Sequence, residues 1–222
     1  MMALPSSPKE LIAWRVAKEL HYGEIVNLGI GTPTLVANYL TPEMNITFQS
    51  ENGFIGMGAL AKPGEEIPDL VNAGGQYVTL LPGAVFFDTA MSFTIIRGGH
   101  VDVTVLGALE VDERGHLANY WIPGRGGPGI GGGMDLVVGT KRVIVAMEHT
   151  RKDGQPKIVP RCSMPITAQR MVDLIVTDLA VIRPTPEGLV LREVAPGVAV
   201  DEVVAKTSAR LIVPDDVGEM VA

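Results

Sequence analysis

The stretch EIVNLGIGTPTLVANYL, residues 24–40, contains the pattern that decides the fold class. Residues 24–29 are rich in apolar and β-branched types and predict a strand. After a glycine turn, Thr32 and Pro33 provide an N-cap and a first-turn proline for a helix that extends through Leu40. A strand, a glycine turn and a helix in this order make one α/β unit.

Further apolar runs predict more strands of the same kind, at residues 46–50, 77–81, 101–106, 142–147, 174–176, 189–191 and 211–213. Nearly continuous apolar strands are typical of a sheet that is covered on both faces. A capping box at residues 7–10 predicts a helix that ends near residues 21–23, and residues 200–207 predict a short one. We therefore expect an α/β fold, a single doubly wound domain over residues 1–222 with a largely parallel or mixed sheet.

Composition limits the function and the partners. The chain has 222 residues and a net charge of −7, which argues against nucleic acid or an anionic membrane as the partner. The single cysteine, Cys162, excludes an internal disulfide and fits a reducing compartment. No run approaches the roughly 18 apolar residues of a membrane helix, and residues 1–5 lack the features of a signal peptide. We expect a cytoplasmic protein.

The tetrapeptide Ser-Glu-Asn-Gly at residues 50–53 is a candidate catalytic segment. It follows an expected strand, and Asn52-Gly53 predicts a tight turn because both residue types tolerate positive φ. An apolar, glycine-punctuated segment follows at residues 54–58. The carboxylate of Glu51 is thus expected at a sheet edge facing a pocket, where partial desolvation suits a nucleophile. Without its setting, a Glu beside such a turn is more often a solvated loop residue.

Two glycine-rich segments are candidate sites for anionic groups. Residues 29–33 connect a strand to a helix, where free N–H groups can bind an anion, but the segment lacks both the dinucleotide fingerprint and the phosphate-loop motif. Residues 124–133 can bring backbone N–H donors close to a substrate, as an oxyanion site requires. The alternatives are a tight turn for the first segment and a mobile surface loop for the second. The four histidines show no metal-ligand spacing, so no metal is expected.

Several segments, taken in order, resemble the B (beta) subunit of family I CoA transferases, in the 3-oxoacid (succinyl-CoA:3-ketoacid) CoA-transferase group. They are NLGIGTP (27–33), FQSENGFIGMG (48–58) and GIGGGMDL (129–136), with further matches at 96–102, 117–119, 162–167 and 177–181. The similarity extends from about residue 8 to residue 213. It implies the CoA-transferase (NagB/RpiA-like) fold.

The resemblance also implies a mechanism and a set of site residues. Glu51 would be the nucleophile that forms an acyl-glutamyl anhydride and then a glutamyl-CoA thioester, and the N–H of Gly132 would be the oxyanion donor. Substrate or CoA binding is implied for Asn27, Gly29, Gly31, Asn52, Gly53 and Gly131. Coenzyme A is a substrate in this scheme, and no cofactor is needed because anhydride and thioester conserve the bond energy.

The family's A-subunit half is absent from this chain. In the family the active site lies between the two halves, which assemble as α2β2 or as a fused chain. The resemblance therefore implies half an enzyme, which moves CoA from succinyl-CoA or acetyl-CoA to a short 3-oxoacid; acetoacetate, 3-oxoadipate and butyrate types stay open. An acyl-CoA hydrolase on the same scaffold and a non-catalytic partner subunit are the alternatives, and a phosphosugar isomerase rests on fold analogy alone.

The sequence departs from the family pattern at three places. Gly133 replaces the usual Ala, Met91 stands where an acidic residue is common, and residues 126–128 replace bulkier ones. These departures bear on loop rigidity and substrate fit.

Overall fold

A mixed sheet of eleven strands forms the framework of the protein in the computed structural model, which describes residues 5–129 and 131–220. Its strands are β1 (Ile25–Leu28), β2 (Thr47–Ser50), β3 (Phe54–Leu60), β4 (Val78–Phe86), β5 (Val103–Leu106), β8 (Arg142–Ala146), β10 (Leu174–Val176), β11 (Ala180–Thr185), β12 (Gly188–Val194), β13 (Leu211–Ile212) and β14 (Gly218–Glu219). A second sheet contains β6 (Glu110–Asp112), β7 (Leu117–Ala118) and β9 (Ile158–Val159). The helices are α1 (Pro8–Ala17), α2 (Thr89–Arg97), α3 (Gly133–Gly139) and α4 (Val200–Ala205), with 3-10 helices η1 (Thr32–Tyr39) and η2 (Pro42–Met44).

The centre of the large sheet is parallel, antiparallel pairs flank it on both sides, and β13 and β14 pair in parallel with β12 at one edge. The order is β13-β12-β11-β10-β8-β5-β1-β2-β3-β4, and β14 also pairs with β12. The five strands from β10 to β2 in this order pair in parallel, whereas β2-β3-β4 and β10-β11-β12 are antiparallel. The expected α/β class with a largely parallel or mixed sheet is therefore confirmed.

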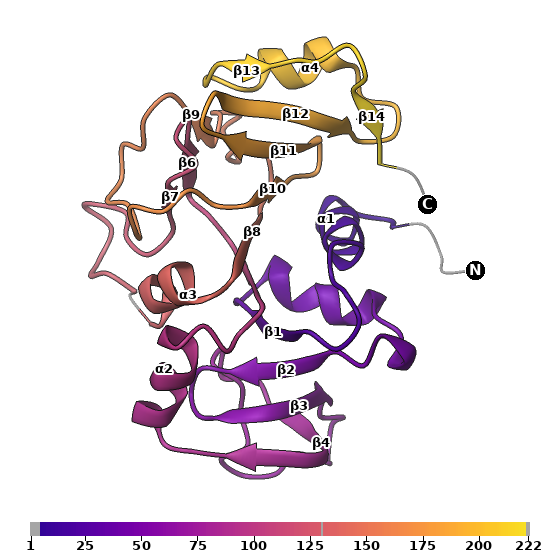
Figure 1. Cartoon of the computed structure of the whole chain (residues 1–222), viewed down its shortest axis with the longest axis vertical. Coiled ribbons are helices and arrows are strands. Elements are labelled where there is room, and N and C mark those ends of the chain that lie inside the picture. The colour runs from indigo at the N-terminus through magenta and orange to yellow at the C-terminus, as the bar shows by residue number, and fades with distance from the viewer. Residues whose placement is uncertain (1–4, 130, 221–222) are drawn as a thin grey trace.

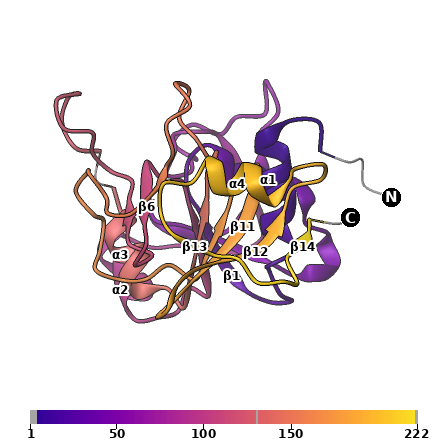
Figure 2. The ribbon, with the colours of Figure 1, turned by 90° about the horizontal axis from the view of Figure 1, so that it is seen from above.

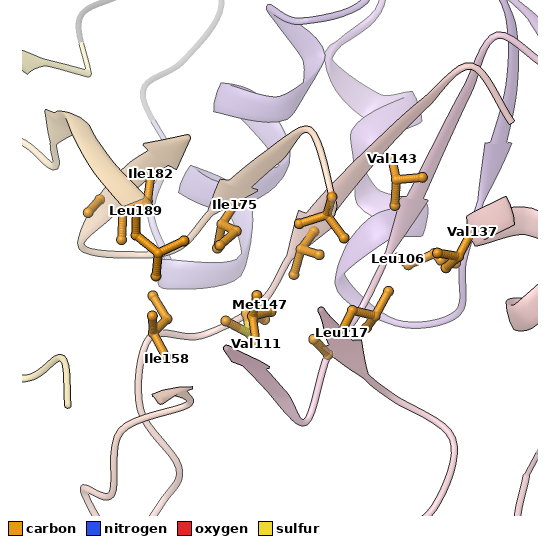
Figure 3. Close-up of a cluster of buried hydrophobic side chains, with 14 of the residues drawn as sticks. Leu106, Val111, Leu117, Val137, Val143, Met147, Ile158, Ile175, Ile182 and Leu189 are labelled. Carbon is orange, nitrogen blue, oxygen red and sulfur yellow. The ribbon is translucent and has the colours of Figure 1, made fainter. Parts of the chain in front are cut away.

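Both faces of the large sheet are covered, as the apolar strands predicted. In β8, Val143 and Val145 belong to one buried cluster, and Ile144 and Ala146 belong to the other. Figures 1 and 2 show α2 and α3 on one side of the sheet and α1 on the other. On the side of α2 and α3, the small sheet adds Val111, Leu117 and Ile158 to the core. They face Ile175 of β10 and Met147, which directly follows β8 (Figure 3).

The N-terminal helix begins where the sequence predicts, and it ends earlier. The side chain of Ser7 caps α1 by accepting a hydrogen bond from the N–H of Glu10, and Pro8 is the first helical residue. The carboxylate of Glu10 also accepts hydrogen bonds from the N–H and the hydroxyl of Ser6. The helix ends at Ala17, before the expected residues 21–23.

The helix expected at residues 32–40 is the 3-10 helix η1, and the expected cap was wrong by one residue. Gly31 is the N-cap, with φ of +88°, and Thr32 is already helical. A glycine adopts this φ without steric cost, so the chain turns into η1 one residue earlier than a threonine cap would allow. Residues 1–4, Ile130 of the glycine-rich loop and residues 221–222 lie outside the described residues, and the single-domain assignment over residues 1–222 stays a prediction. Among the described helices, none combines the length and apolar character of a membrane span.

The buried side chain of His149 connects three segments, which directly follow β8, β10 and α4. Its Nδ1 lies 2.9 Å from the hydroxyl of Thr177, and its Nε2 lies 2.9 Å from the hydroxyl of Thr207. The hydroxyl of Thr207 also donates to the carbonyl of Val203, and the hydroxyl of Thr177 donates to the carbonyl of Ala180. Burial lowers the pKa of His149 to about 4.

We expect this histidine to make the protein less stable in acid. Its folded-state pKa lies below the ordinary value of 6.5. Between these two pKa values, the imidazole is therefore protonated in the unfolded chain and neutral in the folded protein. The stabilising contribution is complete above pH 6.5 and is lost as the pH falls toward 4, by up to about 3 kcal/mol. Urea unfolding at a series of pH values in wild type and His149→Gln measures it. The carboxylates titrate in both proteins and contribute equally. The prediction is therefore wrong if the free energy of unfolding depends on pH in the same way in both.

Candidate active site

Glu51 lies in the turn that joins β2 to β3. The N–H of Gly53 donates to the carbonyl of Ser50 at 3.1 Å and closes the expected tight turn. Gly53 has φ of +127°, and a Cβ at this position would collide with the carbonyl oxygen of Phe87. The turn therefore requires glycine for its conformation and for close packing.

The nucleophile candidate lies at the edge of the sheet that the strand ends form, and it does not lie on an outer strand. The apolar residues 54–58 belong to β3, which pairs antiparallel with β2, so β2 is enclosed between β1 and β3. Glu51 instead lies beyond the carboxyl end of β2, beside the ends of the parallel strands β1 and β5. This is the place where open α/β sheets form their binding crevices.

A cavity of about 360 Å³ opens at these strand ends, and Glu51 lines it. The other walls come from the ends of β1 and β5, from the glycine-rich loop and from the start of α3. The lining residues are Asn27, Leu28, Gly29, Ile30, Ala73, Leu106, Gly107, Ala108, Leu109, Asn119, Gly129, Gly131, Gly132, Gly133 and Leu136. The carboxylate thus faces a pocket, as expected.

The glycine-rich loop brings a backbone donor to this carboxylate. The N–H of Gly132 donates to Oε1 of Glu51 at 3.1 Å, although 81 residues separate the two in the chain. A Cβ on Gly132 would overlap Oε2 of Glu51 and would lie 2.9 Å from its Cδ. A Cβ on Gly131 would lie 3.4 Å from Oε1. Glycine at these positions lets the backbone approach the carboxylate closely enough to bond it.

Asn27 lines the cavity, but its amide nitrogen is already engaged in a buried polar network. Nδ2 of Asn27 donates to Oε1 of Gln49 at 2.8 Å, and Nε2 of Gln49 donates to the hydroxyl of Ser92 at 3.1 Å. The hydroxyl of Thr104 lies 3.5 Å from Oδ1 of Asn27. All four side chains are buried. The arrangement follows from the register, because Asn27 of β1 lies opposite Gln49 of β2 and Thr104 of β5.

Of the remaining predicted site residues, one lines the cavity and three do not. Gly29 lines the cavity, where its N–H donates to the carbonyl of Val105 at 2.8 Å. Gly31, Asn52 and Gly53 are not among the residues that line it. They shape the turns, and Asn52 donates through Nδ2 to the carbonyl of Val71 at 2.7 Å.

Two polar residues of the sequence motifs, Ser50 and Asn119, were assigned no individual role, and the structure shows that both build the site. The hydroxyl of Ser50 accepts from the N–H of Ala73 at 3.1 Å and fixes the loop between β3 and β4 against the nucleophile turn. Asn119 lines the cavity, and its Oδ1 accepts from the hydroxyl of Thr167 at 2.7 Å. The signal available for Asn119 was a polar residue directly after the apolar pair at 117–118.

A larger cavity of about 760 Å³ adjoins the first and shares the lining residues Asn27, Leu28, Ile30 and Ala73. Its walls come from η1, η2, β2, β3 and the segment 72–76. Apart from Glu51, the described side chains that line the two cavities are uncharged.

The departures from the family pattern lie at positions with free space or solvent exposure. A Cβ on Gly133 would lie 3.7 Å or more from its nearest neighbours, so an alanine would fit there. Met91 is 51% exposed on α2, and residues 126–128 are exposed in the loop.

Cys162 is a poor nucleophile. Burial raises the pKa of its thiol to about 12, and the negative charges of Asp112 and Glu110 act in the same direction. Among residues 5–129 and 131–220, His, Cys, Asp and Glu side chains form no group of three that could hold a metal ion.

Comparison with known proteins shows the family. Residues 9–206 match the family model described as coenzyme A transferase. The beta subunit of the acetate CoA-transferase of Escherichia coli K12 is 56% identical over 94% of this chain and 95% of its own length. The B subunit of the succinyl-CoA:3-ketoacid coenzyme A transferase of Helicobacter pylori 26695 is 50% identical over 90% of this chain and 97% of its own.

The fold also has a solved counterpart. The crystal structure of the acyl-CoA transferase YdiF apoenzyme from Escherichia coli O157:H7 superposes with a TM-score of 0.78 at 23% identity. The match covers all of this chain and 44% of that longer chain.

The chain belongs to the coenzyme A transferase family. Its relatives are named as beta or B subunits, which confirms the predicted subunit type and CoA-transferase activity exerted as a subunit pair.

Proposed function

We propose that this chain, paired with an A subunit, transfers CoA from a donor of the acetyl-CoA or succinyl-CoA type to a short 3-oxoacid such as acetoacetate. The reaction proceeds through a glutamyl-CoA thioester on Glu51. The observation that carries the proposal is the 3.1 Å hydrogen bond from the N–H of Gly132 to Oε1 of Glu51 at the cavity. This is a carboxylate with a donor aimed at one of its own oxygens.

In this mechanism one oxygen of Glu51 is the nucleophile, and the other carries the negative charge that develops. Oε2, which does not face the donor, attacks the thioester carbonyl of the acyl-CoA, and the CoA thiolate leaves with the electron pair of the broken C–S bond. The thiolate attacks Cδ of Glu51 and expels the donor acid as its carboxylate. Negative charge develops on Oε1 during this step, and the N–H of Gly132 stabilises it. The second half reverses these steps with the acceptor acid and restores the free carboxylate.

The uncharged walls of the two cavities suit an acid whose tail carries no second charge. A buried carboxylate without a partner is costly, so a dicarboxylate would require a cation on the cavity wall. This chemistry favours acetyl-CoA over succinyl-CoA as the donor, and acetoacetate or butyrate-type acids over 3-oxoadipate. A role in ketone-body metabolism in the cytoplasm is part of the same proposal.

The proposed partner is an A subunit in an α2β2 assembly. Two observations support an A subunit as the partner: the relatives are named as one subunit of a pair, and this chain spans 44% of the longer YdiF chain. The A subunit would close the open side of the cavity and exclude water from the activated glutamyl group.

The direct test is to trap the thioester in the assembled pair. We expect borohydride to inactivate the enzyme only after acetoacetyl-CoA has been added, because it reduces a thioester and leaves a carboxylate intact. Peptide mass spectrometry should then find the side chain of Glu51 reduced to an alcohol. Full activity after this treatment would refute the mechanism. Release of CoA at the same rate with and without acceptor acid would identify a hydrolase instead.

A further inference from the structure

Helix α2 is attached to β2, the strand that directly precedes Glu51. Nε2 of Gln49, two residues before Glu51 in β2, donates to the hydroxyl of Ser92 in α2 at 3.1 Å. Gln49 is 1% exposed and Ser92 is fully buried. Because Oε1 of Gln49 accepts from Asn27, the amide of Gln49 is held at both ends and cannot rotate freely.

A second attachment lies on the other side of Glu51. The carbonyl of Gly53 accepts from the N–H of Phe87 at 2.8 Å. Phe87 directly precedes Asp88, which is the N-cap of α2. The nucleophile turn is therefore bonded on both sides of Glu51. Gln49 bonds to α2 itself, and Gly53 bonds to the residue that precedes the N-cap of α2.

The same helix is also attached to the loop and helix that carry the oxyanion donor. Cε1 of Phe93 lies 3.0 Å from where a Cβ on Gly132 would be. Nε of Arg97 bonds to Oδ1 of Asp135 in α3 at 2.6 Å. A Cβ on Gly139 would collide with the backbone of α2, so the two helices are in close contact there. Figure 1 shows α2 next to α3 on the same side of the sheet.

We propose that α2 acts as a strap that sets the distance between Glu51 and the N–H of Gly132, and that Ser92 is a positioning residue for the transfer reaction. The two catalytic groups are 81 residues apart in the chain, and α2 contacts the segments of both. Ser92 is not among the residues that line either cavity described above, so it acts through Gln49 and not on substrate. The proposal rests on the proposed role of Glu51 and Gly132.

The expected result in the assembled pair is a loss of turnover without a loss of binding. Ser92→Ala removes the acceptor for Nε2 of Gln49 and loosens the strap. A misplacement of about 1 Å at reacting groups costs on the order of 10²-fold in rate, so we expect kcat to fall about 10- to 100-fold. The KM for acyl-CoA should stay within about twofold, because no substrate contact is lost. Ser92→Cys keeps a weaker acceptor at the same position and should give an intermediate kcat.

The matched control is Thr207→Val, which removes another buried hydroxyl with two hydrogen-bond partners, remote from the cavities. It should lower the melting temperature by a similar amount and leave kcat unchanged. The proposal is overturned if Ser92→Ala keeps its full kcat, or if the two variants lose kcat in equal proportion. Should Ser92→Ala not fold, the same comparison is made with Ser92→Cys.

A measurement on the full chain separates this proposal from the proposed function. Hydrogen–deuterium exchange in peptides that cover residues 49–54 and 131–136 should be faster in Ser92→Ala than in wild type or Thr207→Val. Unchanged exchange in these two peptides would refute the strap even if the enzyme is a CoA transferase. A wild-type pair that transfers no CoA would refute the proposed function, and the exchange experiment would still decide whether α2 holds the two segments together.

Discussion

Replacing Glu51 by alanine is expected to reduce CoA transfer by about 10⁴-fold or more, because removal of a covalent nucleophile eliminates the reaction path itself. The side chain is half-buried in a turn that Gly53 closes through the backbone. The fold and the melting temperature should therefore change little. Steady-state transfer from acetoacetyl-CoA to acetate by the assembled pair measures the loss.

The control for this substitution is Glu187→Ala, which removes an exposed carboxylate from the turn between β11 and β12. It should leave transfer at the wild-type rate. Glu51→Ala at more than a tenth of wild-type activity would show that another group accepts the acyl chain, and the covalent mechanism would be wrong.

Replacing Gly132 by alanine should have the second largest effect, a fall in kcat of about 10²- to 10³-fold. The added Cβ would overlap Oε2 of Glu51 and would lie 3.0 Å from Cε1 of Phe93. The carboxylate must then move away from the N–H that bonds it. Gly132 has φ of −86°, outside the left-handed region that favours glycine, so the substitution should act mainly on the site. Transfer kinetics and a thermal melt measure the two consequences separately.

The neighbouring Gly133 offers a matched control. A Cβ there would meet Asn119 at 3.7 Å and Thr167 at 3.9 Å, which are ordinary contacts. Gly133→Ala should keep activity within about twofold, and it should raise the stability slightly, because alanine is the better residue inside a helix. Equal losses in both variants would mean that any change in this loop disables the enzyme, and the specific role of Gly132 would not stand.

The sequence predicted the elements whose signals are local. Residues 174–176 form β10 as expected, and the strand at 24–29 and the helix at 200–207 are confirmed with shorter ends. Several elements were not predicted: β3, β6, β7, β9, β11, β14, α2 and α3. Two of them, β3 and α2, lie next to the site. In β3 the glycines interrupt the alternation that is typical of a strand. Helix α2 begins at Thr89 with Asp88 as its N-cap, and the sequence shows no capping box there that would have indicated a helix. Tertiary pairing, with β4 for the strand and with α3 for the helix, decided both.

The sequence by itself determined the family, the fold class and the turn at Glu51, because apolar patterns, turn residues and contiguous motifs act over a few neighbouring positions. The tertiary structure alone decided which groups meet. It brought the N–H of Gly132 to Oε1 of Glu51, and it occupied the amide of Asn27 with Gln49. These contacts depend on strand order, on register and on the packing of α2 against both segments. Such contacts join residues far apart in the chain, and no local pattern encodes the distance between them.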